Sequence, residues 1–507
     1  MEKQKVFVIV VAVVLSLIVT LFGVFSYPPP HGNSALFIPA AVNFAQGKGL
    51  INEASHLAEW IDKSGNFKFL TYPPLFPVFL GILILPNPTA YGVLFTVAML
   101  EVLIIILSTL VFLKIATIGG EKLTWFKAIL VGFALVATVS PFQNFSTRSD
   151  LLFQLTLLLA MLAAIHLFRS KYLWIFLAAL LGVAAATHPM YIVMLLALVG
   201  LFIAARNPAK AVFFEMIKTF GGGIALFLLL MAVTPLGFIE KMRGVFTHSG
   251  VYGKGGWFWF GSDPYQGAFS QYLNEFVMRF FVNPVSFFSG VFFLLFVIVA
   301  TRLYFDNRKK VGSPFFFNLF LVFFSLALLT IVARPVTVYY FQMLSPFTFA
   351  AVIYAFRSLN FSKIFNAGAV AVFALISVGF VRQAALFPSF LKDGVSLREA
   401  RAAYEEIKPK ACLDRCVGLA SAGLWPLTED YKIAINSLQA KNLGKELGDV
   451  VDVILFQQAY SGRITPPESI DDCALDKNYF VEKQPKILGL KLGSAVPGYG
   501  FASYLCK

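Results

Sequence analysis

Hydrophobic residues in this chain occur in long runs that are separated by short polar segments. Most runs are long enough to cross the hydrocarbon core of a bilayer, which takes about 20 apolar residues in a helix. The pattern therefore predicts an all-α polytopic membrane bundle of about eleven transmembrane helices. The runs lie at 6–25, 89–115, 125–144, 150–168, 172–187, 189–205, 213–234, 284–303, 314–333, 336–356 and 367–387.

Lys and Arg residues indicate the orientation of these helices. Clusters of basic residues fall between alternate pairs of runs, on the same side as Lys3 and Lys5 near the N-terminus. The clusters are Lys114/Lys122/Lys127, Arg169/Lys171, Arg206/Lys210, Arg302/Arg308/Lys309/Lys310 and Arg357/Lys363. Because cytoplasmic loops are rich in Lys and Arg, we predict a cytoplasmic N-terminus and an uncleaved first helix. The segments placed outside the cytoplasm are then 27–88, 144–150, 235–283 and 388–507.

The segment from Tyr72 to Leu85 is apolar but short, and it contains Pro73, Pro74 and Pro77. If it crossed the membrane, every later basic cluster would change sides. We therefore expect a helix that lies in the outer interface or dips into it.

The composition changes near residue 388, where charges of both signs appear and the apolar runs shorten. We predict a membrane domain at 1–390, with outer loops at 27–88 and 235–283, and a soluble extracytoplasmic domain at 391–507. The short apolar run at 450–455 is typical of a buried strand bounded by polar residues. The expected fold of this C-terminal domain is a small mixed α/β domain.

All four cysteines lie in this C-terminal segment. An even number of cysteines in an exported domain favours disulfide bonds. Three pairings exist, of which we favour Cys412–Cys416 together with Cys473–Cys506. A zinc site is the alternative, but the Cys412/Cys416 pair has no second close pair and no nearby histidine.

Composition supports the membrane assignment. Apolar residues make up 58% of the 507 residues, charged residues make up 13%, and the mean hydropathy is +0.76. A soluble domain has about 25% charged residues. The net charge of +14 is carried mostly by short loops. Because no basic stripe with interleaved aromatic residues is visible in the sequence, we expect no binding of nucleic acid.

The first outer loop carries a series of motifs, and two later segments add to them. The loop contains His31-Gly-Asn33, Ala40-Ala41, Gly47-Lys48-Gly49 and Tyr72-Pro73-Pro74-Leu75-Phe76-Pro77. The later segments are Ser149-Asp150 at the start of a run, and Arg334-Pro335 followed by Tyr339-Tyr340. Together these motifs resemble the GT-C class of membrane glycosyltransferases, especially the branch of protein O-mannosyltransferases and the lipid A aminoarabinose transferase.

This resemblance covers the first outer loop closely and the order of helices and loops in the membrane domain. It implies a sugar donor linked to polyprenyl phosphate, used at the outer face of the cytoplasmic (inner) membrane with inversion at the sugar. The partners it implies are this lipid-linked sugar and membrane lipid. It implies no certain cofactor and leaves a divalent cation open. The sugar and the acceptor, whether lipid, glycan or protein, also stay open.

One residue departs from the family pattern. Alignment on Gly47-Lys48-Gly49 places Asn33 where the branch has an acidic residue, which is taken to be the base or to orient the acceptor hydroxyl. An amide can position a hydroxyl but cannot accept its proton at neutral pH. Three interpretations are open: Asp150 or Glu53 supplies the carboxylate, His31 is the base, or the activity is weak or different.

The other candidate site residues are ionisable or aromatic side chains near the predicted outer face. Transfer from a phosphate-linked donor needs a base near the acceptor and cations near the leaving phosphate. The predicted catalytic residues are Asp150, Asn33 and Glu53. The predicted substrate-binding residues are His31, Tyr72, Arg148, His188, Arg243, His248, Lys254, Arg334 and Tyr339, and no metal ligand is predicted.

Several of these residues also have a purely structural interpretation. Asp150 can pair with Arg148 or with the positive end of its own helix. Arg334 can extend its guanidinium to the membrane interface, and His188 can serve as a hairpin turn. The glycine-rich and aromatic segment 247–259 is either a lid over a lipid-sugar cleft or a loop that rests on the membrane.

The sequence thus predicts a glycosyltransferase that moves a sugar from a polyprenyl-phosphate donor. The alternatives are a catalytically inactive GT-C-like scaffold and a protein that binds or transports a lipid-linked sugar. Asn33 favours the scaffold. A transporter would carry charges in the middle of its helices, and almost none is present apart from Glu101.

Overall fold

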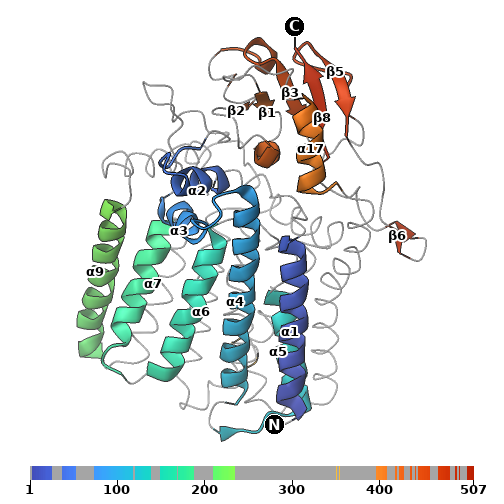
Figure 1. The fold of residues 1–507 in the computed structure, drawn as a ribbon. Helices are drawn as coiled ribbons and strands as arrows, with labels where there is room; N and C mark the ends of the chain where they lie inside the picture. Colours follow the sequence, from blue (N-terminus) through green and yellow to red (C-terminus); the bar gives the residue numbers. More distant parts are fainter. Residues whose placement is uncertain are drawn as a thin grey trace, which may run out of the picture. The chain divides into compact units, whose positions relative to one another are not determined.

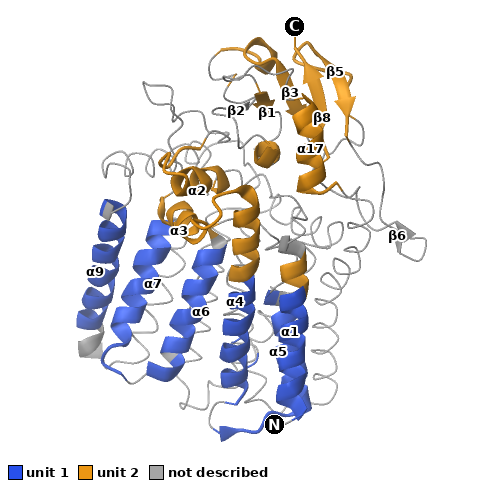
Figure 2. Cartoon of the chain, in the orientation of Figure 1, with its two compact units in different colours: residues 1–17, 101–144, 150–381 blue, residues 18–100, 145–149, 382–507 orange. Residues whose placement is uncertain are grey.

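The structure is a computed structural model of the 507-residue chain. It describes residues 3–24, 37–52, 73–117, 120–138, 149–167, 170–187, 209–233, 350, 353, 395–407, 417–419, 422–427, 434–436, 440, 444–456, 466–479, 486–487, 490–491 and 500–506. Two compact units are distinguished in Figure 2. Unit 1 comprises residues 1–17, 101–144 and 150–381, and unit 2 comprises residues 18–100, 145–149 and 382–507.

Six described helices coincide with predicted apolar runs (Figure 1). They are α1 (Lys3–Val24), α4 (Ala90–Ala116), α5 (Trp125–Thr138), α6 (Asp150–Leu167), α7 (Leu173–Thr187) and α9 (Ala209–Val233). Three of them contain stretches that are long and apolar enough to cross a membrane, namely Lys3–Leu21, Ala90–Ala116 and Phe213–Ala232. These helices identify the chain as a membrane protein.

The other predicted runs lie outside the described residues, apart from the helical residues Ala350 and Ile353. They are the runs at 189–205, 284–303, 314–333, 336–356 and 367–387. The total of about eleven transmembrane helices therefore stays a prediction.

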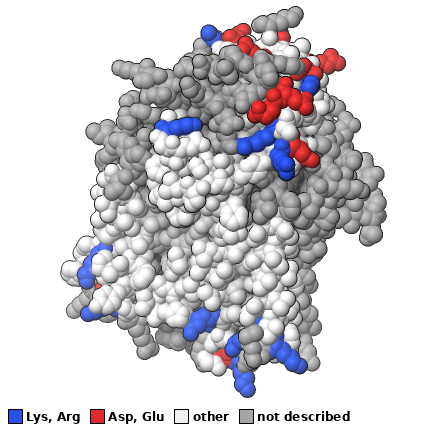
Figure 3. All heavy atoms as spheres, in the orientation of Figure 1, with Lys and Arg blue, Asp and Glu red and all other residues white. Residues whose placement is uncertain are grey.

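The outward surfaces of the unit 1 helices are apolar, as contact with lipid requires. Leu17 of α1 is 58% exposed, and Phe213 and Phe214 of α9 are each 65% exposed. Soluble proteins rarely expose large contiguous apolar surfaces, whereas lipid-facing helices do. In Figure 3 the sides of these helices are drawn white, and Lys and Arg gather toward their lower ends in this view.

Helices α1 and α5 meet near their N-terminal ends within unit 1. The ring centroids of Phe7 and Trp125 lie 6.0 Å apart, with an interplanar angle of 64°. A Cβ on Gly132 would lie 3.3 Å from Cε1 of Phe7, so the glycine lets α5 come close to α1. Lys5 and Lys127 therefore lie at the same end of the unit, which is what the predicted orientation requires.

Helices α7 and α9 pack closely through small residues. A Cβ on Gly222 would lie 3.1 Å from Cβ of Ala178, and a Cβ on Gly182 would lie 2.8 Å from Cβ of Leu226. Small residues of this kind let membrane helices approach one another. The second contact is four residues beyond the first on both helices, so α7 and α9 run parallel.

The direction of the chain brings three helix ends together in unit 1. Helix α6 contacts α7, and a connection of only a few residues, 168–172, makes the two helices antiparallel. Since α9 runs parallel to α7, the first residue of α6 lies at the same end as the last residues of α7 and α9 (Figure 1). These residues are Asp150, Thr187 and Val233.

The C-terminal part of unit 2 has a mixed α/β fold, as predicted. Its six-stranded sheet has the order β2-β1-β3-β8-β5-β4, in which β1 is parallel to β2 and β3, and β8 is antiparallel to β3 and β5. The strands are β1 (Val417–Leu419), β2 (Ala434–Asn436), β3 (Val453–Phe456), β4 (Ser469–Ile470), β5 (Cys473–Asn478) and β8 (Ala502–Leu505), with β6 (Lys486–Ile487) and β7 (Leu490–Lys491) as a separate pair. The strand predicted at 450–455 is β3, whose residues are all buried.

Three short helices accompany this sheet, namely α17 (Leu397–Ile407), η6 (Ala422–Leu427) and η7 (Leu447–Asp449). A capping box begins α17. The N–H of Glu399 donates to the Ser396 hydroxyl at 3.2 Å, and the N–H of Ser396 donates to the Glu399 carboxylate at 2.8 Å. Leu397, Ala400, Tyr404 and Ile407 recur at helical spacing and form its buried face.

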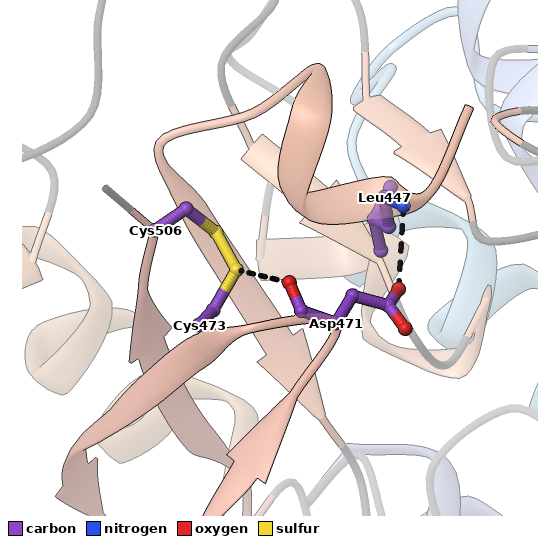
Figure 4. The surroundings of a disulfide bond; sticks show 4 residues. All are labelled: Leu447, Asp471, Cys473 and Cys506. Carbon is purple, nitrogen blue, oxygen red and sulfur yellow. Dashed lines mark hydrogen bonds between the residues drawn. A yellow bond between two sulfur atoms is a disulfide. The ribbon is translucent and has the colours of Figure 1, made fainter.

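A disulfide bond, Cys473–Cys506, links β5 to the end of β8 (Figure 4). The two Cα atoms are 4.2 Å apart, and the bond joins cysteines that are 33 residues apart in the chain. The predicted pairing of these two cysteines is confirmed, which excludes them as zinc ligands. The predicted Cys412–Cys416 pair lies outside the described residues.

Helix η7 packs directly against this disulfide. The carboxylate of Asp471 accepts a hydrogen bond from the N–H of Leu447 at 3.2 Å. A Cβ on Gly448 would lie 2.3 Å from the carbonyl oxygen of Asp471 and 2.8 Å from Sγ of Cys473. The helix can therefore lie this close to the bridge only because residue 448 has no side chain.

Candidate active site

The predicted first outer loop contains two short helices of unit 2, α2 (Ile38–Ala45) and α3 (Leu75–Leu83). The nine residues of α3 extend about 14 Å, which is too short to cross a hydrocarbon core of about 30 Å. The segment predicted to lie in the interface thus forms a short helix. Pro74 occupies its N-cap position, where a missing backbone N–H costs little.

Helices α2 and α3 pack tightly against each other. The rings of Phe37 and Phe76 meet edge to face, with centroids 5.4 Å apart and an interplanar angle of 84°. A Cβ on Gly81 would lie 2.6 Å from Cδ1 of Phe44 and 2.9 Å from the carbonyl oxygen of Ala41. The two helices can therefore touch only because α3 has a glycine at this position.

The turn after α2 is fixed by glycine conformation and by one buried amide. Gly47 and Gly49 have φ values of +76° and +89°, which are left-handed conformations that favour glycine. The carbonyl of Asn43 accepts a hydrogen bond from the N–H of Lys48 at 2.9 Å. The side-chain amide of Asn43 donates to the carbonyl of Ile51 at 3.0 Å. Asn43 thus holds both sides of the turn, and Lys48 is exposed at its tip.

A further hydrogen bond connects this turn to the segment after α3. The amide Nε2 of Gln46 donates to the carbonyl of Pro88 at 2.9 Å. The two motif-bearing parts of the loop, residues 37–52 and 73–88, therefore form one folded structure.

Four predicted site residues adjoin this folded loop but lie outside the described residues. They are His31, Asn33, Glu53 and Tyr72. Glu53 directly follows the buried residue Asn52, and Tyr72 directly precedes Pro73.

The end of unit 1 that contains the start of α6 carries the other predicted catalytic residue. Asp150 is the first residue of α6. A carboxylate in this position interacts favourably with the positive end of the helix dipole. His188 directly follows Thr187, the buried last residue of α7. The side chain of Asp150, and all of Arg148 and His188, lie outside the described part of the chain.

One buried polar residue near Asp150 was not predicted from the sequence. Gln154 lies one turn further along α6, and only 1% of its surface is exposed. Its Nε2 atom has no hydrogen-bond partner in the described structure. In the sequence, Gln154 could have been recognised as a single amide side chain within an otherwise apolar run.

The remaining predicted site residues lie outside the described ranges. They are Arg243, His248, Lys254, Arg334 and Tyr339. Among the residues that the structure does describe, no group of three or more His, Cys, Asp or Glu side chains is arranged to hold a metal ion.

Within unit 2, Arg401 of α17 connects three segments. Its guanidinium lies 5.2 Å from the ring centroid of Tyr91, near the start of α4. Its Nε and Nη2 atoms donate hydrogen bonds to the carbonyl of Pro426 in η6, at 3.2 and 2.9 Å. A cation over an aromatic ring is attracted by the ring's negative face. Arg401 thus ties the C-terminal sheet region to the N-terminal end of α4.

An exposed ion pair joins α17 to the sheet. The ammonium of Lys477 lies 3.0 Å from the carboxylate of Glu406, and the hydroxyl of Tyr479 lies 3.5 Å from the same oxygen. The hydrogen bond with Lys477 lowers the pKa of Glu406, and it raises the pKa of Lys477 in turn. Partial burial is the main reason that the pKa of Tyr479 is raised. Because the pair is exposed, its contribution to stability is small.

Comparison with known proteins found similarity to several solved structures. No protein-family model matches the chain, and no curated protein matches it. A crystal structure of the Archaeoglobus fulgidus oligosaccharyltransferase with zinc and sulfate has 13% identity over 89% of this chain and 69% of that one, with a TM-score of 0.49. The archaeal oligosaccharyltransferase AglB of the same organism, in complex with an inhibitory peptide and a dolichol-phosphate, has 11% identity over 91% and 70%, with a TM-score of 0.46. Both TM-scores are below 0.5, so these likenesses do not establish the fold or activity of this chain.

Proposed function

We propose that this protein is a membrane glycosyltransferase that moves a sugar from a polyprenyl-phosphate donor to a hydroxyl acceptor at the outer face of the cytoplasmic membrane. The observation that carries the proposal is the folded first outer loop. Three of the motifs that resemble the GT-C class, Ala40-Ala41, Gly47-Lys48-Gly49 and the segment from Pro73 to Pro77, lie in one folded structure, in which Asn43 holds the turn and Gly81 lets the two helices touch. A membrane protein with this loop suits an enzyme that works on a lipid-linked substrate.

In the proposed reaction, Asp150 is the general base. Its carboxylate takes the proton of the acceptor hydroxyl while the hydroxyl oxygen attacks the anomeric carbon. The bond from that carbon to the phosphate oxygen breaks, and its electron pair stays on the phosphate. Attack from the opposite face inverts the sugar. Asn33 positions the acceptor hydroxyl through its amide, and Glu53 is the second candidate base.

Cations assist departure of the phosphate in this proposal. Arg334, Lys254 and Arg243 are the residues assigned to it, because fixed positive charges stabilise the negative charge that develops on a leaving phosphate. Aromatic and histidine side chains of the outer loops then contact the sugar. The acceptor is a lipid, a glycan or a protein, each of which offers the hydroxyl that this reaction needs.

The second candidate function is a scaffold that has lost catalysis, which the amide at position 33 favours. Transfer of radiolabelled sugar from polyprenyl-phosphate donors into membranes separates the two. Membranes that contain the wild-type protein should incorporate label above membranes without it. If the wild type incorporates none and Asn33→Asp restores incorporation, the scaffold is the correct function. If neither protein uses any donor, the glycosyltransferase assignment is wrong.

A further inference from the structure

A buried amide on α6 has no partner in the described structure, and burying such a group is unfavourable. Gln154 is 1% exposed, and its Nε2 atom donates no hydrogen bond. In a membrane helix the cost is especially clear, because no bulk water is present to satisfy the amide. A bound ligand with an oxygen that accepts a hydrogen bond from this amide would remove this free-energy cost.

Several threonine hydroxyls in α5, α6 and α7 form hydrogen bonds within their own helices. The hydroxyls of Thr138, Thr156 and Thr187 each donate to the carbonyl four residues earlier, at 2.8, 2.7 and 2.6 Å. Ser108 and Thr219 also have buried hydroxyls without a partner in the described residues. A helical hydroxyl can rotate onto the carbonyl of the preceding turn, whereas the Gln154 amide donates to no carbonyl in the described structure.

The position of Gln154 on α6 relates it to the candidate base. Residues four apart lie on the same face of a helix, so Gln154 and Asp150 share one face. The Cα–Cβ bond of a helical residue tilts toward the N-terminus, so the Gln154 side chain leads toward the end where Asp150 lies. Along the axis the two residues are separated by about 6 Å, with Gln154 deeper in the helix.

We infer that the side-chain amide of Gln154 donates a hydrogen bond to a phosphate oxygen of the lipid-linked donor, an inference that rests on the proposed function. A lipid-linked sugar enters with its chain in the membrane, its phosphate next and its sugar outermost. Gln154 lies one turn deeper than Asp150, which matches a phosphate beneath the site of proton transfer. A neutral donor can be buried there without a second charge, and its hydrogen bond to a charged oxygen is stronger than one to a neutral group.

The test is binding of a long-chain polyprenyl monophosphate to the full-length protein in lipid nanodiscs, compared with the polyprenol of the same length. The variants are Gln154→Leu and Gln154→Met, which keep the size of the side chain and remove the donor. Thr156→Val is the matched control on the same helix, because its hydroxyl already bonds the carbonyl of Leu152.

We expect both Gln154 variants to bind the monophosphate about tenfold to a hundredfold more weakly, with binding of the polyprenol unchanged. Their melting temperatures should equal or exceed that of the wild type, because an unpaired buried amide is removed. Equal affinity of wild type and both variants for the monophosphate would overturn the inference and leave the proposed function standing. If both variants bound the monophosphate and the polyprenol equally more weakly, and melted at a lower temperature, Gln154 would have a structural role instead. A wild type that does not prefer the monophosphate would overturn the polyprenyl-phosphate donor as well.

Discussion

Gly81 of α3 lies directly against Ala41 of α2, where a single added carbon would come within 2.9 Å of the Ala41 carbonyl oxygen. Because this oxygen belongs to the backbone of a helix, it cannot move aside as a flexible side chain can. The contact between the two loop helices therefore depends on one missing side chain. It also fixes the distance between the two parts of the loop that carry the candidate motifs.

Gly81→Ala should destabilise the protein and reduce the proposed transferase activity. Overpacking of a close contact typically costs about 1–3 kcal/mol, and the separation of α2 from α3 would displace the residues that adjoin them. The melting temperature in detergent and the rate of sugar transfer are the two measurements. Gly221→Ala is the matched control, since a Cβ there meets nothing within 4 Å and alanine favours a helix by about 1 kcal/mol. Equal effects of the two substitutions would contradict the tight contact.

The Cys473–Cys506 disulfide should hold the C-terminal sheet together. In the chain-entropy description, a bond across 33 residues stabilises the folded state by about 4 kcal/mol. The double variant Cys473→Ala/Cys506→Ala should therefore be cut faster by protease within residues 395–507, while the membrane helices stay protected. Mass spectrometry of unreduced peptides tests the bond itself. Detection of either cysteine linked to a different partner would refute the pairing.

The ion pair of Glu406 and Lys477 should make a small contribution to the free energy of unfolding, and this contribution should disappear in acid. The pKa of Glu406 is lowered in the folded state, so its contribution is present above the ordinary value of 4.5 and is lost as the pH falls through the lowered pKa. The pKa of Lys477 is raised, so its contribution is present below 10.5 and is lost as the pH rises through the raised pKa. Between these two pH limits, the contribution of the ion pair to stability is constant.

A double-mutant cycle measures this coupling. Glu406→Gln, Lys477→Gln and the double variant would be compared by thermal unfolding at pH 7 and at pH 3. We expect a small positive coupling at pH 7 that shrinks at pH 3 and in high salt. A coupling that is the same at both pH values would show that charge does not hold the pair.

The long hydrophobic runs made the helices of the membrane part predictable. The run at 89–115 became α4 and the run at 172–187 became α7, each within one residue of the predicted bounds. This succeeded because a bilayer imposes both a minimum length and a uniform polarity on a spanning helix. In the C-terminal domain, the strand β3 was recognisable because its apolar residues are contiguous and bounded by polar residues.

The contacts that form the candidate site were harder to predict from the sequence. Gly81 resembles any glycine in an apolar helix, and only the packing of α2 on α3 shows why a side chain would not fit. Gln154 stands alone in an apolar run, and its burial without a partner becomes visible only when neighbouring helices are in place. The resemblance to GT-C enzymes predicts roles for Asn33 and Asp150. It does not show that Gln154 lies one helical turn further along α6 than Asp150 does.

The central claim is that Asp150 is the base of a sugar transfer, and release of free polyprenyl phosphate by the purified protein tests it most directly. Wild type, Asp150→Asn and Glu121→Gln would be compared, the last as a control because Glu121 pairs with Lys127, at the other end of the helices. The account predicts that Asp150→Asn lowers the rate by about a hundredfold to ten-thousandfold, with folding and donor binding retained, while Glu121→Gln stays near the wild-type rate. A wild-type rate in the folded Asp150→Asn protein would contradict the account.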